Sequence, residues 1–220
     1  MIFHPDDLEN RDRYKLIIGS IVPRPIAWVS SMDALGNLNL APFSYFTAVC
    51  PTPMTIVFCP GIHPHTGEKK DTWRNIEQVP EFVINITNEE TAEQMNLSAT
   101  VLPFGQSEFV WAGVTAVPSE RISVPRVAEA PISFECTLQQ IVTISDKPGG
   151  GAAIFGTVRC VHVRDDLLHD GRIDTDLLRP IGRLAGNSYT RVAEPFVMER
   201  IAAPSMGLDV PDAADTPGGG

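Results

Sequence analysis

Short runs of apolar and β-branched residues, each closed by Gly, Pro, Asn or Asp, recur along this sequence. Such runs between turn-forming residues are typical of antiparallel β-strands. The clearest runs are residues 26–31, 55–59, 82–87, 133–144 and 153–164. The pattern therefore predicts a mainly β protein. Gly36 and Asn37 follow the first run and can adopt positive φ at low cost, so we expect a hairpin turn over residues 33–37.

Two short helices are expected between the strands. Good helix formers follow Asp71 and Thr72, either of which could cap a helix over residues 72–79 that Pro80 ends. The segment 87–90 reads Thr-Asn-Glu-Glu and fits a capping box, which predicts a second helix reaching to about residue 98.

Length and composition favour one domain. The chain has 220 residues, of which 43% are hydrophobic, enough for a full core in a single unit. We expect residues 1–202 to form that domain. Residues 203–220 are rich in Pro, Gly, Ala and Asp without apolar periodicity, so a mobile end is predicted there.

Charge and cysteine use exclude several classes of partner. The net charge of −10 opposes binding to nucleic acid or to an anionic membrane surface. No apolar run approaches the roughly 18 residues that a membrane span requires. The four cysteines show no CxxC spacing, and the start lacks a basic segment before an apolar run. These features predict reduced thiols and a cytoplasmic location.

The segment Lys69-Lys70-Asp71-Thr72 is a candidate anion site. A helix that starts near Thr72 offers unpaired N–H groups and a partial positive charge, and Lys70 adds a full charge. Ser30 and Ser31, at a strand end, could supply hydroxyl donors. The alternative is a solvated loop followed by an ordinary helix cap. Asp71 is expected to support the site, because its carboxylate would repel an anion.

Several motifs, in order, resemble the flavin reductase-like family, whose members are FMN-binding split-barrel flavoproteins. The matching segments are RPIAWVSS (24–31), GN (36–37), APFS (41–44), KKDT (69–72) with NI behind it, EFVINI (81–86), Glu135-Cys136 and the block 179–189. The resemblance spans about residues 14–200 and departs at Ala185, where the family commonly has a second glycine. It implies an antiparallel, Greek-key split β-barrel with short helices, a homodimer, and one FMN in each of two clefts at the subunit interface.

The resemblance also assigns cofactor contacts. Lys70 and Thr72 would hold the phosphate together with Ser30 and Ser31. Pro42 cannot donate to a sheet, so residues 41–44 are expected to leave the ladder and present N–H groups to the flavin edge. An irregular core crossing is the alternative. The ring and rim contacts expected are Trp28, Ala41, Pro42, Phe43, Ser44, Phe46, Arg183, Asn187 and Tyr189.

The block 183–189 is expected near the cofactor cleft and within reach of the partner subunit. Two alternatives stay open: Arg183 pairs with Asp174 or Asp176, and Tyr189 serves only in packing.

The function implied is an FMN-dependent oxidoreductase, an NAD(P)H:flavin reductase that passes a hydride to flavin N5 without a catalytic side chain. The donor is NADH or NADPH, and a monooxygenase component is one candidate acceptor partner. The alternatives are an FMN-binding electron carrier of the flavoredoxin kind and a non-catalytic flavin-binding or sensing protein.

Other patterns predict no chemistry. His63-Pro64-His65 has no obvious third ligand and is interpreted as a loop. His162 lies in an alternating run and is interpreted as a satisfied core or barrel-lining histidine. The aspartates of residues 165–176 do not have EF-hand spacing and predict a solvated face. Glycines 149–151 predict a flexible loop without the spacing of a dinucleotide fingerprint.

Overall fold

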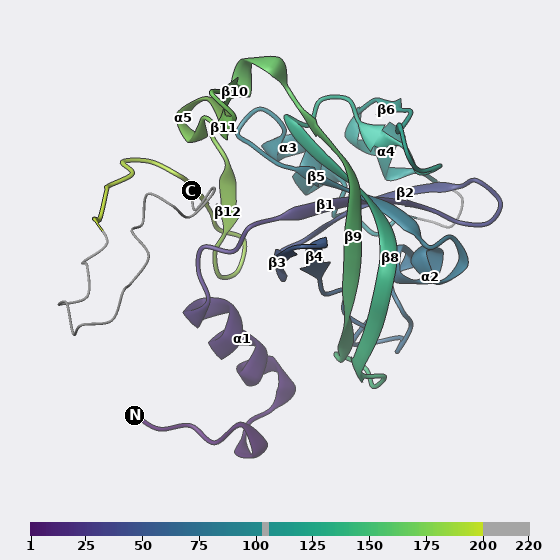
Figure 1. Ribbon diagram of the computed structural model, residues 1–220. Coiled ribbons are helices and arrows are strands. Elements are labelled where there is room, and N and C mark those ends of the chain that lie inside the picture. Colours follow the sequence, from purple (N-terminus) through teal and green to yellow (C-terminus); the bar gives the residue numbers. More distant parts are fainter. Residues whose placement is uncertain (103–105, 200–220) are drawn as a thin grey trace, which may run out of the picture.

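A computed structural model describes residues 1–102 and 106–199 of the chain (Figure 1). The mobile end predicted for residues 203–220 lies outside the described residues, as does the end of the predicted domain at 200–202. None of the described helices has the length and apolar character required to cross a membrane.

Seven strands form one antiparallel sheet in the order β2-β1-β5-β8-β9-β4-β3. Their bounds are β1 (Ala27–Met32), β2 (Leu38–Phe43), β3 (Phe46–Pro51), β4 (Met54–Phe58), β5 (Glu81–Ile86), β8 (Ile132–Ser145) and β9 (Gly151–Val163). All five predicted runs are strands of this sheet. The mainly β fold class is therefore confirmed.

Smaller elements surround the sheet. Three two-stranded ribbons pair β6 (Ala116–Val117) with β7 (Arg126–Val127), β10 (Leu168–His169) with β11 (Arg172–Ile173), and β12 (Ile181–Arg183) with β13 (Tyr189–Arg191). The helices are α1 (Asn10–Ser20), α2 (Asp71–Gln78), α3 (Ala92–Leu97), α4 (Glu108–Ala112) and α5 (Thr175–Leu178), with 3₁₀ turns η1 (Pro5–Asp7) and η2 (Asp165–Leu167).

The inner face of the rolled sheet holds the main core. Phe58 lies at its centre, with ring centroids 5.1 Å from Phe43 and 5.4 Å from Phe82. A Cβ at Gly156 would lie 2.4 Å from Phe82 Cζ, so only glycine admits this ring. Trp73 and Ile76 of α2 join the same core. On the outer face, α3 and α4 cover a second cluster that includes Trp28, Leu40, Met95 and Phe109.

The hairpin predicted at residues 33–37 joins β1 to β2. Asp33 Oδ1 accepts hydrogen bonds from the N–H groups of Leu35 and Asn37, both at 2.9 Å, and Gly36 has φ +88°. The turn is therefore fixed by the residues that predicted it. Of the predicted loop at residues 149–151, Gly149 and Gly150 lie in the turn between β8 and β9, and Gly151 is the first residue of β9.

Both predicted helices are present as α2 and α3, but the caps predicted for them were wrong. Lys70 is the N-cap residue of α2 and makes no side-chain cap bond, while Asp71 pairs with Arg74. The second helix begins only at Ala92, and the hydroxyl of Thr87 has no hydrogen-bond partner among the described residues. Contacts to the segment 179–180, including the 3.1 Å bond from Glu89 N–H to Arg179 O, hold residues 88–90 outside the helix.

The expectation that residues 41–44 leave the ladder was also wrong for residues 41–43. Pro42 lies opposite Trp28 in the regular β1–β2 register. The N–H of Leu40 points away from β1, past the free edge of the sheet, and donates to Glu108 Oε2 at 3.1 Å. Because residues two apart on a strand point the same way, the nitrogen of Pro42 also points past the free edge. Because β2 is an edge strand, a proline here costs the sheet no ladder bond.

Asn85 cross-links the centre of the sheet. Its Nδ2 donates to Trp28 O at 2.9 Å, and its Oδ1 accepts from Val127 N–H at 3.0 Å and from Ser133 Oγ at 2.9 Å. The side chain is fully buried. One amide therefore joins β1, β5, β8 and β7.

We predict that Asn85→Ala lowers the free energy of unfolding by about 3 kcal/mol, because buried polar partners in three other strands lose their bonds. The change is measured by urea denaturation. Asn10→Ala, at an exposed position in α1, is the matched control and should stay within about 0.5 kcal/mol of the parent. Equal unfolding midpoints for the two variants would show that the Asn85 bonds contribute no net stability.

Candidate functional site

A hollow lies at the start of α2, beside the outer edge of β2. Lys70, Asp71 and Thr72 line one side of it and Asn39, Ala41 and Pro42 another; His63, Glu108 and residues 98–102 complete the lining. The hollow therefore brings together four of the predicted site residues, Ala41, Pro42, Lys70 and Thr72.

Lys70 is the cation of this hollow. Its Nζ lies 5.6 Å from the centroid of the Phe43 ring. Among residues 1–102 and 106–199, no carboxylate lies within 4.0 Å of it, whereas the neighbouring Lys69 pairs with Glu77 at 2.5 Å. Burial lowers the pKa of Lys70, because desolvation disfavours the ammonium form. An anion beside Lys70 would offset that cost.

The first turn of α2 adds backbone donors. The carbonyl of Lys70 accepts from the N–H groups of Trp73 and Arg74, at 3.0 and 3.2 Å. The N–H groups of Asp71 and Thr72 make no hydrogen bond within the described part of the chain. These free amides and the positive end of the helix dipole lie next to Lys70. The set matches the donors that a phosphate requires.

Buried hydrogen bonds fix this helix start to the sheet. Asn39 Nδ2 donates to Thr72 Oγ1 at 2.9 Å, and Asn75 Nδ2 donates to Ser31 Oγ at 3.2 Å. All four side chains are buried. Thr72 and Ser31 thus hold the helix in place beside the hollow.

Ser30 and Ser31 do not form the predicted pair of hydroxyls. Successive strand residues point to opposite faces. Ser31 faces α2, while the hydroxyl of Ser30 donates to Pro125 O at 2.7 Å on the outer face.

The residues predicted to contact the flavin ring lie in different parts of the structure. Phe43 is buried in the inner core, and the partly buried Phe46 packs against it. Trp28 is fully buried, with Nε1 bonded to Ser98 Oγ at 2.8 Å. Ser44 Oγ accepts from Arg24 Nε at 3.2 Å. Residues 41–44 therefore pass from the hollow to a buried arginine.

Sequence reasoning missed that arginine. Arg24 is 5% exposed, and its Nη1 donates to the carbonyls of Ile18 and Ile21, both at 2.7 Å. Its Nη2 donates to Leu184 O at 3.0 Å. One guanidinium therefore joins the end of α1, the block 183–189 and Ser44. Apart from the RPIAWVSS motif, the sequence does not indicate that Arg24 is buried, because backbone carbonyls can pair with it at any residue type.

Glu108 was also missed. Its carboxylate lies in the hollow and accepts the outward N–H of Leu40. Burial raises the pKa of Glu108 and the charge of Asp71 adds to that rise, although the Leu40 hydrogen bond opposes it. Glu108 is nearly seventy residues away in sequence from the strand it covers, and no motif linked the two.

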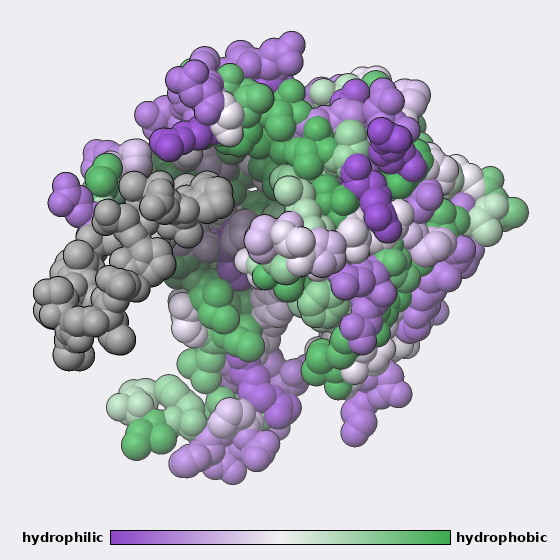
Figure 2. Space-filling view, viewed as in Figure 1, coloured by the Kyte–Doolittle hydropathy of each residue, from purple (hydrophilic) through white to green (hydrophobic). Residues whose placement is uncertain are grey.

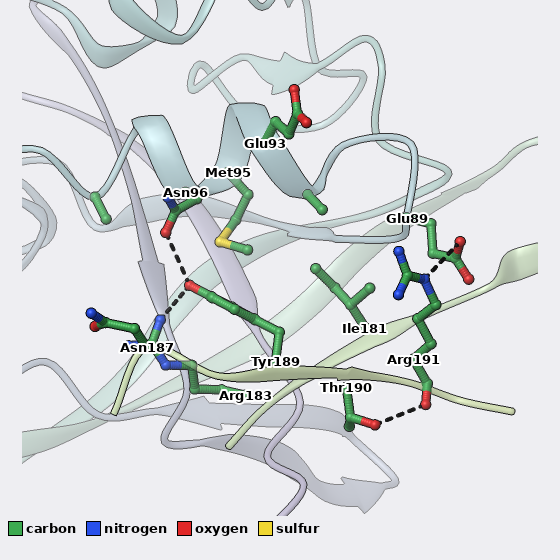
Figure 3. A pocket seen from close by; sticks show the side chains of 12 residues that line it. Glu89, Glu93, Met95, Asn96, Ile181, Arg183, Asn187, Tyr189, Thr190 and Arg191 are labelled. Carbon is green, nitrogen blue, oxygen red and sulfur yellow. Dashed lines mark hydrogen bonds and ion pairs between the residues drawn. The ribbon is translucent and has the colours of Figure 1, made fainter. Parts of the chain in front are cut away.

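A larger cavity, of about 760 Å³, lies between α3 and the β12–β13 ribbon (Figure 3). Arg183, Asn187 and Tyr189 line it. Arg183 Nη1 donates to Tyr189 Oη, which donates to Asn96 Oδ1 at 3.2 Å. The alternative pairing of Arg183 with Asp174 or Asp176 is not formed. Ala99 lines both hollows, so the cavity adjoins the Lys70 hollow without being part of it.

The structure also describes three of the segments for which the sequence predicted no chemistry. Residues 63–68 form a turn closed by the 2.9 Å bonds from His63 N–H to Glu68 O and from Gly67 N–H to His63 O. His162 is satisfied by Glu135 at 2.6 Å. Asp174 caps α5, and most of the aspartates of residues 165–176 are exposed.

Comparison with known proteins places this geometry in a family. The sequence model of the family described as flavin reductase like domain matches residues 18–175 of this chain. The protein BH2278 of Halalkalibacterium halodurans is 43% identical over 202 residues, covering 91% of this chain and 96% of that protein.

Two solved structures are similar over nearly their whole length. Nitrilotriacetate monooxygenase component B from Bacillus cereus is 38% identical, with a TM-score of 0.86 over 90% of this chain and 98% of that chain. The 2-nitrobenzoate 2-nitroreductase NbaA of Pseudomonas fluorescens is 32% identical, with a TM-score of 0.81 over 97% of this chain and 100% of that chain. A flavin reductase with a split barrel domain from Shewanella frigidimarina is 21% identical, with a TM-score of 0.77 over 91% of this chain and 100% of that chain, which confirms the predicted split-barrel fold. The chain belongs to the flavin reductase-like family.

Proposed function

We propose that this protein binds FMN with its phosphate at Lys70 and the first turn of α2, and reduces it with NADH or NADPH. The observation that carries the proposal is the partly buried Lys70 beside two backbone amides, none of which has a partner in residues 1–102 and 106–199. Family membership supports a flavin as the ligand that brings the anion.

The isoalloxazine ring then lies along residues 41–44, at the outer edge of β2. An edge strand leaves outward backbone groups without a ladder partner. The N–H of Leu40 donates to Glu108, and Pro42 has no N–H. The N–H groups of this edge that are available to a ring therefore come after Pro42. Ser44 is held in place by Arg24. These contacts support a rigid backbone at residues 41–44, the platform for the ring, beside the phosphate site.

When bound, the flavin supplies the hydride-accepting chemistry, and the protein supplies position and electrostatics. Lys70 holds the anion, and the network of Asn39, Thr72, Asn75 and Ser31 keeps its helix in register with the platform. No side chain is proposed as an acid or base. The four free thiols and the need for a reduced nicotinamide support a cytoplasmic location.

The similar structures suggest two classes of acceptor. The Bacillus cereus protein is a monooxygenase component, which favours a flavin-dependent oxygenase as the partner of this chain. The similarity to NbaA favours a second candidate, a nitroaromatic compound reduced directly at the site.

We predict that the purified protein loaded with FMN is bleached by NADH or NADPH under anaerobic conditions, because the bound flavin accepts the hydride. Flavin absorbance is followed during titration, with free FMN at the same concentration as the control. Re-oxidation by 2-nitrobenzoate in the absence of oxygen would assign the nitroaromatic acceptor. Bound flavin that no nicotinamide bleaches would contradict a reductase and favour a flavoredoxin-like electron carrier.

We also propose a homodimer that completes the cleft. The hollow at Lys70 is open, and α1 buries only Ile18 while Tyr14, Ile17 and Ile21 are 58%, 48% and 59% exposed. Figure 2 shows apolar surface over α1. A two-fold partner that covers this surface could bring its own block 183–189 toward the flavin.

Sedimentation at micromolar concentration is expected to give a dimer. Ile17→Glu places a charge in the exposed apolar face of α1 and should shift the protein to monomer and weaken FMN binding, whereas Lys15→Glu, on the same helix, should do neither. A monomer that binds FMN fully would contradict both the dimer and the shared cleft.

A further inference from the structure

Three metal-ligating side chains converge on the outer face of the β8–β9 hairpin, away from the Lys70 hollow. Glu135 lies directly opposite Cys160 in the antiparallel register, and His162 follows two residues after Cys160. Residues two apart on a strand share a face. The pairing of these two long strands therefore presents a carboxylate, a thiol and an imidazole together.

Their ligand atoms are close. His162 Nε2 lies 2.6 Å from Glu135 Oε1 and 3.7 Å from Cys160 Sγ, and all three atoms lie within 4.8 Å of one another. Glu135 is fully buried, while the side chain of His162 is 23% exposed. The cluster is thus rigid on one side and open to solvent on the other.

The carboxylate is already oriented. Glu135 accepts the N–H groups of Glu120 and Arg121, both at 2.7 Å. Burial works against ionisation, but these bonds and the His162 contact outweigh it, so the pKa of Glu135 lies below its usual value. The two amides leave lone pairs of the same oxygens free toward His162 and Cys160.

The hydrogen bond between His162 and Glu135 leaves the Cys160 thiol beside the same imidazole nitrogen, at 3.7 Å. One imidazole nitrogen faces both the carboxylate and the sulfur, and a proton on Nε2 serves only one of them well. Cys160 is also not needed to hold Glu135 or the segment 119–124. Three converging Lewis bases are the arrangement that a metal ion satisfies.

We propose that Glu135, Cys160 and His162 form a binding site for a zinc-class divalent cation. Thiolate and imidazole ligands select Zn²⁺ or Co²⁺ over Mg²⁺ and Ca²⁺, which require oxygen. Tetrahedral zinc needs about 3.6 Å between sulfur and nitrogen and about 3.3 Å between nitrogen and oxygen. The first separation is close to the 3.7 Å between Cys160 Sγ and His162 Nε2, and the second requires the partly exposed His162 to move away from Glu135. A water molecule would take the fourth position.

Binding requires no redox step. Cys160 would bind as the thiolate, with its proton released to solvent, and His162 would bind through an unprotonated Nε2. Glu135 keeps its bonds to Glu120 and Arg121, which tie the metal to the segment 119–124. Zinc should therefore stabilise the fold.

The probe is Co²⁺ added to the full-length protein, without flavin. We expect one equivalent to bind with a thiolate-to-cobalt charge-transfer band in the near ultraviolet. Cys160→Ser and His162→Gln should lose the band and weaken Co²⁺ more than about 100-fold, beyond the usual cost of losing an outer contact. Cys50→Ser is the matched control and should retain both. A band that survives in Cys160→Ser, or no band at all, would overturn the site.

A second measurement needs no variant. Zn²⁺ at about ten times its dissociation constant should slow alkylation of Cys160 about tenfold and leave Cys50 and Cys59 unchanged, as followed by peptide mass spectrometry. Equal protection of all three thiols, or none of Cys160, would refute the proposal. Neither measurement depends on flavin binding, so failure here leaves the proposed function untouched.

Discussion

The hydrogen bond from Asn39 to Thr72, with that from Asn75 to Ser31, is the contact on which the proposed site depends. It joins α2 to β1 and β2 through buried side chains, which must be paired because unpaired polar groups there would be costly. The same contact lets Trp73 enter the inner core. Core packing and the position of Lys70 are therefore set together.

The outer edge of β2 is the second constraint. Edge strands expose unpaired backbone groups, and proteins usually cover or blunt them. Here Glu108 covers the N–H of Leu40, and Pro42 removes the next outward donor. The edge is thus closed up to Pro42, beside the hollow that Lys70 lines. Arg24 links Ser44, two residues after Pro42, to the block 183–189.

Much of the fold could be predicted from the sequence, because strand runs and their turns are local signals. Asp33 and Gly36 fix the first hairpin through their own neighbours. The predictions failed where contacts between residues far apart in the sequence determine the local structure. Asn88 and Glu89 meet residues 179–180 and start no helix, and Pro42 stays in the ladder because β2 happens to be an edge. The geometry of each depends on neighbours far along the chain.

The site was predictable in part for the same reason. Lys70 and Thr72 lie in one motif and form one wall of the hollow. Ser30 was paired with Ser31 although strand alternation sends the two to opposite faces. Glu108 and Arg24 carried no signal of their own, since the first covers a distant strand edge and the second is paired with three carbonyls and the hydroxyl of Ser44.

The central claim is that Lys70 and the first turn of α2 hold a phosphate. It is tested most directly by measuring FMN and riboflavin affinity for Lys70→Ala beside Lys69→Ala. We predict that Lys70→Ala weakens FMN binding by about 1.5–3 kcal/mol, the range of a charged hydrogen bond, and leaves riboflavin binding nearly unchanged. Lys69→Ala should alter neither, because Lys69 pairs with Glu77. Equal losses of FMN and riboflavin in Lys70→Ala would contradict a phosphate at Lys70.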